Sequence, residues 1–230
     1  MSVAVLVFPG SNCDRDAERA LTELGLKARR VWHRDPLGDA DAVVLPGGFS
    51  YGDYLRSGAL AAHSPAIAEV RSLAKRGVPI LGICNGFQIL CEAGLLPGAL
   101  TVNRSRQFRC TWEHVRVERA LPGGYGEDAG KPGTVWSLPI AHREGCWWAD
   151  AETRATVAGE GEVWLRYCGP DGSLADAYNP NGSLDHVAGL VRGRVMALMP
   201  HPERATDAWL GGTDGAQLLT AWAHRMGAAS

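Results

Sequence analysis

The 230-residue sequence lacks the features that mark secreted, membrane-spanning and nucleic-acid-binding proteins. Its N-terminal apolar stretch, residues 3–8, has no basic region before it and is too short for a signal-peptide core or a transmembrane helix. The formal net charge of −2 provides no general attraction for nucleic acid or for a membrane surface. We therefore expect a cytoplasmic protein that binds neither of them.

The sequence also lacks paired cysteine motifs. Its six cysteines are widely scattered and form no Cys-x-x-Cys pair; they are Cys13, Cys84, Cys91, Cys110, Cys146 and Cys168. Without a secretory signal or metal-ligand spacing, this distribution argues against a disulfide framework and against a zinc site. We expect reduced thiols and no bound metal.

Neither low-complexity segments nor internal repeats are visible. A composition of 46% hydrophobic and 21% charged residues is ordinary for a globular protein. The length is sufficient to bury most of the apolar surface in one core. The sequence therefore predicts a single domain over residues 1–230.

The first 94 residues alternate short apolar runs with helical patterns, which is typical of a parallel sheet with crossover helices. Strands are expected at residues 3–8, 27–32, 42–45 and 78–83, and helices at 14–24 and 67–75. Ser11 and Asn12 are expected to cap the first helix. Open α/β sheets place their sites in loops after the carboxyl ends of such strands.

From residue 101 onward the pattern changes to alternating segments, which predict antiparallel or mixed strands. Candidate strands are 111–118, 135–140, 162–167 and 195–199, and a closing helix is expected at 217–225. Residues 121–133 contain five glycines and two prolines and are expected to form the most mobile loop.

The most informative stretch is Gly-Ile-Cys-Asn-Gly at residues 82–86, between an apolar run and a helical pattern. A sharp turn there would hold Cys84 at a helix N-terminus, where the macrodipole and free amides favour the reactive thiolate. Flanking glycines would let strand and helix approach closely. Composition alone produces this motif in about one such chain in ten, and free cysteines are often simply buried.

A histidine and a carboxylate, His201 and Glu203, stand two residues apart after the apolar run 195–198. On an extended chain such residues project to the same side, so Glu203 can orient the His201 ring while its other nitrogen faces a nucleophile. The alternative is a histidine that only caps a loop.

Residues 45–52 form a glycine-rich turn directly after a strand. Consecutive glycines let backbone amides converge on an anion, either a phosphate or a tetrahedral oxyanion. The turn matches neither a phosphate loop nor a dinucleotide fingerprint. Taken alone, it is better explained as a plain turn.

In this order and at this spacing, the three motifs Pro46-Gly47-Gly48, Gly82 to Gln88 and His201-Pro202-Glu203 resemble the class I glutamine amidotransferase family. The resemblance implies a flavodoxin-like α/β fold, with a central mostly parallel sheet, flanking helices and an additional small antiparallel or mixed sheet. It also implies that Cys84 is the nucleophile, His201 the general base and acid, and Glu203 its orienting partner. The backbone amides of Gly48 and Asn85 would form the oxyanion hole.

The resemblance extends from residue 3 to about 225 and is strongest to glutaminase subunits that supply ammonia in purine biosynthesis. Residues 46–56, 179–183 and 199–204 carry it. It implies contacts to glutamine from Gly47, Gln88, Asn103, Ser105 and Phe108. One departure is Arg143, where this subfamily usually has glycine, and a Cβ there disfavours a turn with positive φ.

The resemblance implies that the chain hydrolyses glutamine and passes ammonia to a large synthetase subunit, with a small accessory subunit in the complex. The chain has no recognisable ATP motif, so ATP and Mg are expected in the synthetase, and this chain itself needs no cofactor. Candidate residues for partner contacts or an ammonia channel are Arg56, Arg104, Arg106 and His142.

Three alternatives remain open. The chain could serve another class I amidotransferase, or it could be a cysteine hydrolase or chaperone-like relative, although those elbows commonly place His directly after Cys and this chain has Asn85. It could also be a scaffold subunit without turnover. The presence of Cys84, His201 and Glu203 together argues against the scaffold.

Overall fold

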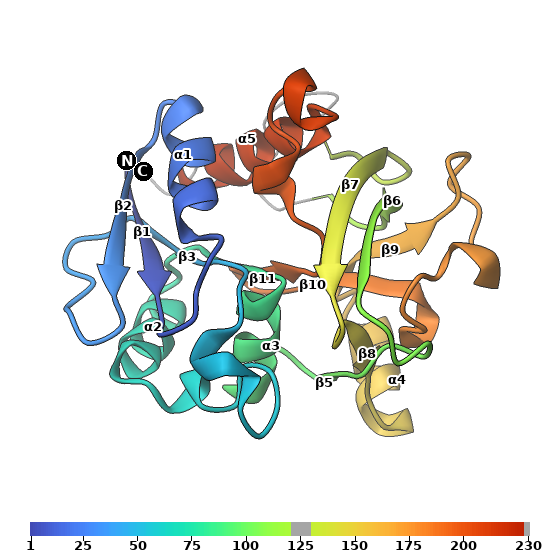
Figure 1. Ribbon diagram of the computed structural model, residues 1–230, viewed down its shortest axis with the longest axis horizontal. Coiled ribbons are helices and arrows are strands. Elements are labelled where there is room, and N and C mark those ends of the chain that lie inside the picture. The colour runs from blue at the N-terminus through green and yellow to red at the C-terminus, as the bar shows by residue number, and fades with distance from the viewer. Residues whose placement is uncertain (121–129, 228–230) are drawn as a thin grey trace.

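The computed structural model describes residues 1–120 and 130–227, and within them nine strands join in one sheet (Figure 1). The sheet order is β2-β1-β3-β4-β11-β10-β9-β6-β7. Part of the glycine-rich loop expected at 121–133, residues 121–129, lies outside the described residues.

The first five strands of this order are parallel and form the half of the sheet that carries the sequence motifs. They are β2 (Lys27–Trp32), β1 (Ser2–Val7), β3 (Ala42–Leu45), β4 (Ile80–Ile83) and β11 (Val195–Leu198). Helices α1 (Asp14–Glu23) and α5 (Asp214–Gly227) lie on one face, and α2 (Pro65–Lys75) and α3 (Asn85–Glu92) lie on the other (Figure 1). The predicted crossover arrangement is confirmed.

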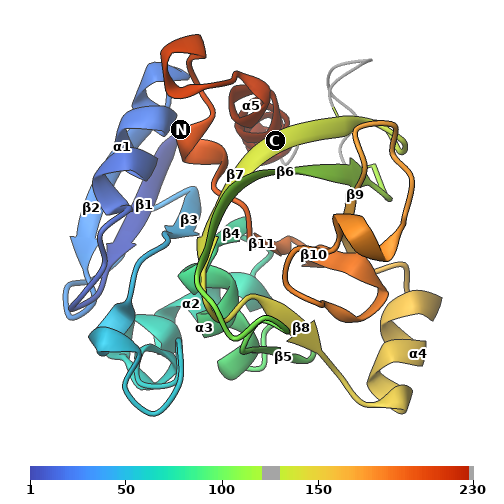
Figure 2. The same ribbon diagram turned by 45° about the vertical axis from the view of Figure 1, so that its right-hand side comes forward.

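The other four strands continue the same sheet in antiparallel fashion (Figure 2). They are β10 (Val187–Arg192), β9 (Val163–Cys168), β6 (Arg109–Val117) and β7 (Val135–His142). A separate antiparallel pair, β5 (Ala99–Thr101) and β8 (Cys146–Trp148), forms the additional small sheet that was expected. Strand β10 and helix α4 (Ala151–Gly159) were not predicted.

Short 3-10 turns connect several of these elements. They are η1 (Ser50–Asp53), η2 (Ala61–His63), η3 (Asp176–Tyr178), η4 (Leu184–His186), η5 (Pro202–Arg204) and η6 (Ala208–Leu210). Turn η1 follows the glycine-rich turn and η5 follows His201, so these two shape the loops at the carboxyl edge of the sheet.

The expected cap of the first helix is wrong. The N-cap of α1 is Cys13, and no side chain caps the helix. The Ser11 hydroxyl instead accepts a hydrogen bond from the Phe8 amide at 3.0 Å, and Ser11 bridges to Gly48. Because acidic residues in the first turn interact favourably with the helix dipole, Asp14 and Asp16 support this N-terminus.

The core lies around the central strands. Every residue of β3, β4 and β11 is buried, which explains why these segments read as continuous apolar runs: helices cover both faces of the sheet there. No helix among the described residues is long and apolar enough to cross a membrane.

Two glycines allow α3 to lie against this core. A Cβ added to Gly86 would collide with the backbone carbonyl of Leu45 at the end of β3. A Cβ on Gly82 would come within 2.6 Å of the Leu90 side chain and 2.8 Å of the Gly86 backbone. The close strand-to-helix approach expected for these glycines is therefore confirmed.

Replacing Gly86 with Ala should destabilise the protein by about 1–3 kcal/mol, the usual cost of overpacking, because backbone must move to admit the methyl group. Urea denaturation measures the difference. Gly159→Ala is the matched control: its Cβ meets nothing within 4 Å at the end of α4, so we expect no loss of stability. Equal urea midpoints for Gly86→Ala and Gly159→Ala would contradict the close approach of α3 to the end of β3.

Candidate active site

The pairing of three parallel strands brings the sequence motifs together. β4 pairs with β3 on one side and with β11 on the other. Because parallel strands end at the same edge of a sheet, the loops that begin at Pro46, Cys84 and Met199 are neighbours. This edge is where the side chains discussed below converge.

Cys84 occupies a strained turn between β4 and α3. Its backbone has φ 50° and ψ −103°, a combination that non-glycine residues rarely adopt, and such strain is commonly stored at functional sites. The Cys84 amide donates to Leu198 O of β11 at 2.8 Å, which ties the turn to the next strand. The residue is 4% exposed, and its Sγ lies 3.8 Å from Ala141 O.

His201 and Glu203 form a buried pair. His201 Nδ1 is 2.6 Å from Glu203 Oε1, and each residue is 1% exposed. The His201 amide also donates to Pro139 O at 2.8 Å, which fixes the backbone of the segment. The other ring nitrogen, Nε2, makes no hydrogen bond to a described residue.

The environment favours the charged form of His201. Burial lowers the pKa of His201, but the carboxylate of Glu203 and the thiolate of Cys84 raise it, and its pKa lies well above the usual value. An imidazolium facing a thiolate is the arrangement in which a cysteine nucleophile is activated.

Cys13 is a neighbour of this pair that the sequence reasoning missed. Ligand atoms of Cys13, His201 and Glu203 all lie within 4.8 Å of one another, and Arg204 Nη2 donates to Cys13 Sγ at 2.9 Å. These are atoms that could coordinate a metal ion, but a metal there would occupy the same His201 and Glu203 that orient each other. The only sequence signal for Cys13 is its position just after β1.

The glycine turn lies against the histidine. A Cβ on Gly47 would come within 2.6 Å of His201 Cε1 and 3.2 Å of Cys13 Sγ, so only glycine fits beside the ring. Gly48 has φ 144° and bridges to Ser11. Asn85 opens α3, where amides have no partner within the helix. The two amides predicted for the oxyanion hole therefore belong to the glycine turn and to the first residue of α3, and their role stays a prediction.

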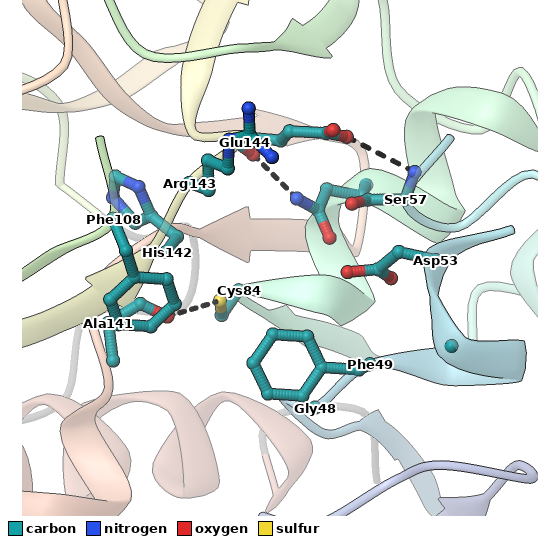
Figure 3. Close-up of a pocket in the computed structure, with 12 residues that line it drawn as sticks. Gly48, Phe49, Asp53, Ser57, Cys84, Phe108, Ala141, His142, Arg143 and Glu144 are labelled. Carbon is teal, nitrogen blue, oxygen red and sulfur yellow. Dashed lines mark hydrogen bonds between the residues drawn. The ribbon is translucent and has the colours of Figure 1, made fainter. Parts of the chain in front are cut away.

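A cavity of about 340 Å³ opens onto Cys84 (Figure 3). It is lined by Gly48, Phe49, Gly52, Asp53, Ser57, Cys84, Gln88, Phe108, Ala141, His142, Arg143 and Glu144. Small-molecule sites commonly enclose about 300–1,000 Å³, so the space suits a ligand of amino-acid size. Among the expected glutamine contacts, Gln88 and Phe108 line it.

The Gln88 side chain is held at both ends by the protein. Its Oε1 accepts from Asn85 Nδ2 at 2.8 Å, and its Nε2 donates to Glu144 O at 2.5 Å. Gln88 therefore connects the start of α3 to the loop after β7. In this geometry it positions the cavity wall, and its contact with a substrate stays a prediction.

Asn103 and Ser105 do not line the Cys84 cavity. Asn103 is 1% exposed, and its Nδ2 donates to Gln107 O at 3.0 Å and to His142 O at 2.9 Å. Ser105 lines a separate cavity of about 560 Å³ together with Arg104. The geometry thus gives Asn103 a supporting role and does not support a Ser105 contact with a ligand at Cys84.

His142 is a buried, neutral side chain next to the site. Because Asn103 Nδ2 is used as a donor, Asn103 Oδ1 is the acceptor for His142 Nδ1 at 3.2 Å, which leaves the proton on Nδ1. Burial, together with the charge of His201, lowers the pKa of His142 to about 3. His142 Nε2 is therefore an acceptor, and it has no partner among the described residues.

The remaining arginine candidates lie outside the cavity or on its rim. Arg56 forms an ion pair with Glu92 at 2.5 Å. Arg106 sits in a turn with φ 58° and does not line the Cys84 cavity. Arg143 lines the cavity, and its backbone is not left-handed, so the expected difficulty with a side chain at this turn does not arise.

The chain matches known proteins over nearly its whole length. The family model for the CobB/CobQ-like glutamine amidotransferase domain matches residues 1–220. The chain is 54% identical over 229 residues to the phosphoribosylformylglycinamidine synthase subunit PurQ of Halobacterium salinarum, covering 97% of this chain and 100% of that protein. It is also 54% identical over 219 residues to the PurQ subunit of Thermus thermophilus, covering 94% of each.

Among solved structures, the chain resembles one chain of the PurLQS structure from Thermotoga maritima, with a TM-score of 0.83 and 42% identity. That match covers 96% of this chain and 97% of the other. A glutamine amidotransferase from Thermotoga maritima, at 14% identity and a TM-score of 0.62, shares the fold.

Replacing Glu203 with Gln should lower the pKa of His201, because the carboxylate that stabilises the imidazolium is lost. An NMR titration of the His201 ring measures this pKa. A raised pKa contributes stability that is complete below about pH 6.5 and disappears as the pH rises through the folded-state value. Glu203→Gln should therefore cost on the order of 3 kcal/mol at pH 6 and less at alkaline pH.

The control for this variant is Glu23→Gln, which removes an exposed carboxylate 3.8 Å from Arg19 and should change stability by less than about 1 kcal/mol. An unchanged His201 titration in Glu203→Gln would show that the pair does not set the charge of the ring.

Proposed function

Because the chain belongs to the CobB/CobQ-like glutamine amidotransferase family, we infer that it acts as the glutaminase subunit of phosphoribosylformylglycinamidine synthase. The observation that carries this inference is a sequence identity of 54% to two PurQ subunits over nearly the whole of both chains. We further propose that residues 1–230 form one functional domain.

The proposed reaction begins at Cys84. Its thiolate attacks the side-chain carboxamide carbon of glutamine, and the carbonyl π electrons move onto oxygen. The amides of Gly48 and Asn85 then donate to this oxyanion, which is the largest electrostatic contribution expected in such a step. The burial of Cys84 and its place in the cavity lining support this assignment.

His201 transfers the protons. As an imidazolium it protonates the departing nitrogen, so that ammonia leaves and a glutamyl thioester remains on Cys84. The neutral imidazole then accepts a proton from water, which attacks the thioester and releases glutamate. Glu203 forms a hydrogen bond with His201 Nδ1, so it holds the imidazole ring in position throughout and stabilises its charged form.

The ammonia is used by a second active site. In this proposal the large synthetase subunit (PurL) holds ATP and Mg and converts formylglycinamide ribonucleotide to the amidine, and the small accessory subunit (PurS) completes the complex. Transfer within a closed path prevents loss of ammonia by protonation and diffusion. The proposal also assigns the reaction to the cytoplasm, where the Cys84 thiol stays reduced.

A cysteine hydrolase of related fold is the competing function. Asn85 follows the nucleophile here, whereas those enzymes commonly have a histidine in that position. Incubation with glutamine and trapping of a glutamyl adduct on Cys84 separates the two, because only an amidotransferase forms that adduct.

Replacing Cys84 with Ala should abolish glutamine-dependent synthesis of the amidine by the reconstituted complex, because no thioester can form. Synthesis from added ammonia should continue at the wild-type rate, since that step takes place in the synthetase. Both rates are measured in the same assay with either nitrogen donor.

Cys110→Ala is the control, because Cys110 is an exposed thiol on β6 that does not line the cavity, and both rates should be retained. Glutamine-dependent synthesis that survives in Cys84→Ala would disprove the nucleophile assignment. Loss of the ammonia-dependent rate as well would indicate that the variant disrupts the complex.

A further inference from the structure

A second cavity reaches Glu203 from a side that the Cys84 cavity does not share. It encloses about 290 Å³, and Glu203, Trp112 and Leu210 are among the residues that line it. No residue lines both cavities. Trp112 and Leu210 are each 41% exposed, so this cavity opens to solvent at their side. It therefore leads a small ion to Glu203 by a path that a ligand at Cys84 does not block.

Glu203 has an unused oxygen. Its Oε1 contacts His201 Nδ1 at 2.6 Å, whereas its Oε2 is buried and has no hydrogen-bond partner among the described residues. Buried carboxylate oxygens are normally paired, because an unpaired one costs free energy. The second oxygen is thus available to a ligand that carries positive charge.

Cys13 adds a soft ligand at the same place. Its Sγ and one ligand atom each of His201 and Glu203 lie within 4.8 Å of one another, and each of the three residues is 1% exposed. The Arg204 guanidinium donates to Cys13 Sγ at 2.9 Å, which favours the thiolate, the form of cysteine that binds metals. Thiolate, imidazole and carboxylate are the ligands that zinc takes in proteins.

The separations are close to those of a zinc site. Zinc binds sulfur at about 2.3 Å and nitrogen or oxygen at about 2.0–2.2 Å, which places the ligand atoms of a tetrahedral site roughly 3.3–3.8 Å apart. His201 Nδ1 and Glu203 Oε1 have to separate from 2.6 Å, and the Cys13 sulfur has to approach from at most 4.8 Å. Each movement is about 1 Å or less. The thiolate and the carboxylate balance the charge of the ion, so Arg204 faces a site that is neutral overall.

We propose that Cys13, His201 and Glu203 bind Zn²⁺, with water as the fourth ligand, and that the bound ion inhibits the enzyme. The inhibition rests on the proposed glutaminase function, whereas the metal site itself does not. The ion is a regulatory ligand and not a resident cofactor, because the proposed reaction requires His201 and Glu203 to be free of it.

Coordination removes the proton acceptor of the reaction. Zn²⁺ replaces the proton between His201 Nδ1 and Glu203, and that proton leaves to solvent. The lone pair of Nδ1 is then used, and the remaining ring hydrogen stays on Nε2. A ring in this state has no lone pair to accept a proton from water, so the thioester on Cys84 is not hydrolysed.

Binding is measured with Co²⁺ as the probe in the full-length Cys84→Ala protein, so that the nucleophile cannot supply the sulfur. Cobalt in a tetrahedral site with a thiolate ligand gives visible bands and a near-ultraviolet sulfur-to-metal charge-transfer band. Both should appear in Cys84→Ala, disappear when Zn²⁺ is added, and be absent from Cys84→Ala/Cys13→Ser. Glu203→Gln in the Cys84→Ala background should weaken cobalt binding at least about tenfold, since a ligand is lost.

Cys84→Ala/Cys110→Ala is the matched control, because Cys110 is an exposed thiol that lines neither cavity, and its cobalt spectrum should equal that of Cys84→Ala. The inference is overturned if Cys84→Ala shows no charge-transfer band or if the band survives Cys13→Ser. Unchanged cobalt affinity in Glu203→Gln overturns it as well, and this variant decides the question where Cys13→Ser fails to fold.

The intact complex tests the inhibition. Buffered Zn²⁺ should suppress synthesis of the amidine from glutamine and leave synthesis from added ammonia unchanged. Saturating glutamine should not relieve the inhibition, because no residue lines both cavities, and a zinc-selective chelator should restore the rate.

Two results in the complex would contradict the inference. Relief by glutamine would place the ion between Cys84 and His201, and an equal loss of both rates would place it on the synthetase. Absence of synthesis from glutamine in the metal-free complex would instead overturn the proposed function, and the cobalt spectra would still decide whether Cys13 and Glu203 bind a metal.

Discussion

The structure depends on the register with which β4 lies between β3 and β11. The Cys84 amide donates to Leu198 O at 2.8 Å, and this hydrogen bond extends the β4–β11 pairing to the residue that stands beside the segment carrying His201. A shift of one residue in this pairing would turn every side chain of the strand to the opposite face. The glycine turn after Leu45 is aligned in the same way, because β3 pairs with the other side of β4.

The most deeply buried ion pair among the described residues lies at this edge. A buried ion pair such as His201 with Glu203 contributes little to stability, because desolvation of both groups offsets their attraction. The fully apolar strands behind it supply the stability that such a site requires. The strained backbone of Cys84 lies at the same edge, so the apolar strands also offset the cost of that conformation.

The sequence predicted the parallel half of the fold well because four of its five strands are short apolar runs with clear borders. The strands 27–32 and 42–45 agree with the structure at both ends. Strand β10 was missed: Gly189 interrupts its apolar pattern, and its pairing with β9 is irregular. Cys13 could not be placed beside His201 from sequence, because that neighbourhood arises from contacts between distant loops.

The contact between Cys13 and Arg204 joins residues 191 positions apart, and the turn at Gly47 lies between Cys13 and the His201 ring. The site is therefore assembled from the first strand-end loop to be synthesised and from one of the last segments to leave the ribosome. Domains generally fold as units, so a nascent chain that already contains Cys84 still lacks His201, the base in the proposed mechanism. In this mechanism, Cys84 cannot hydrolyse glutamine until translation is nearly complete.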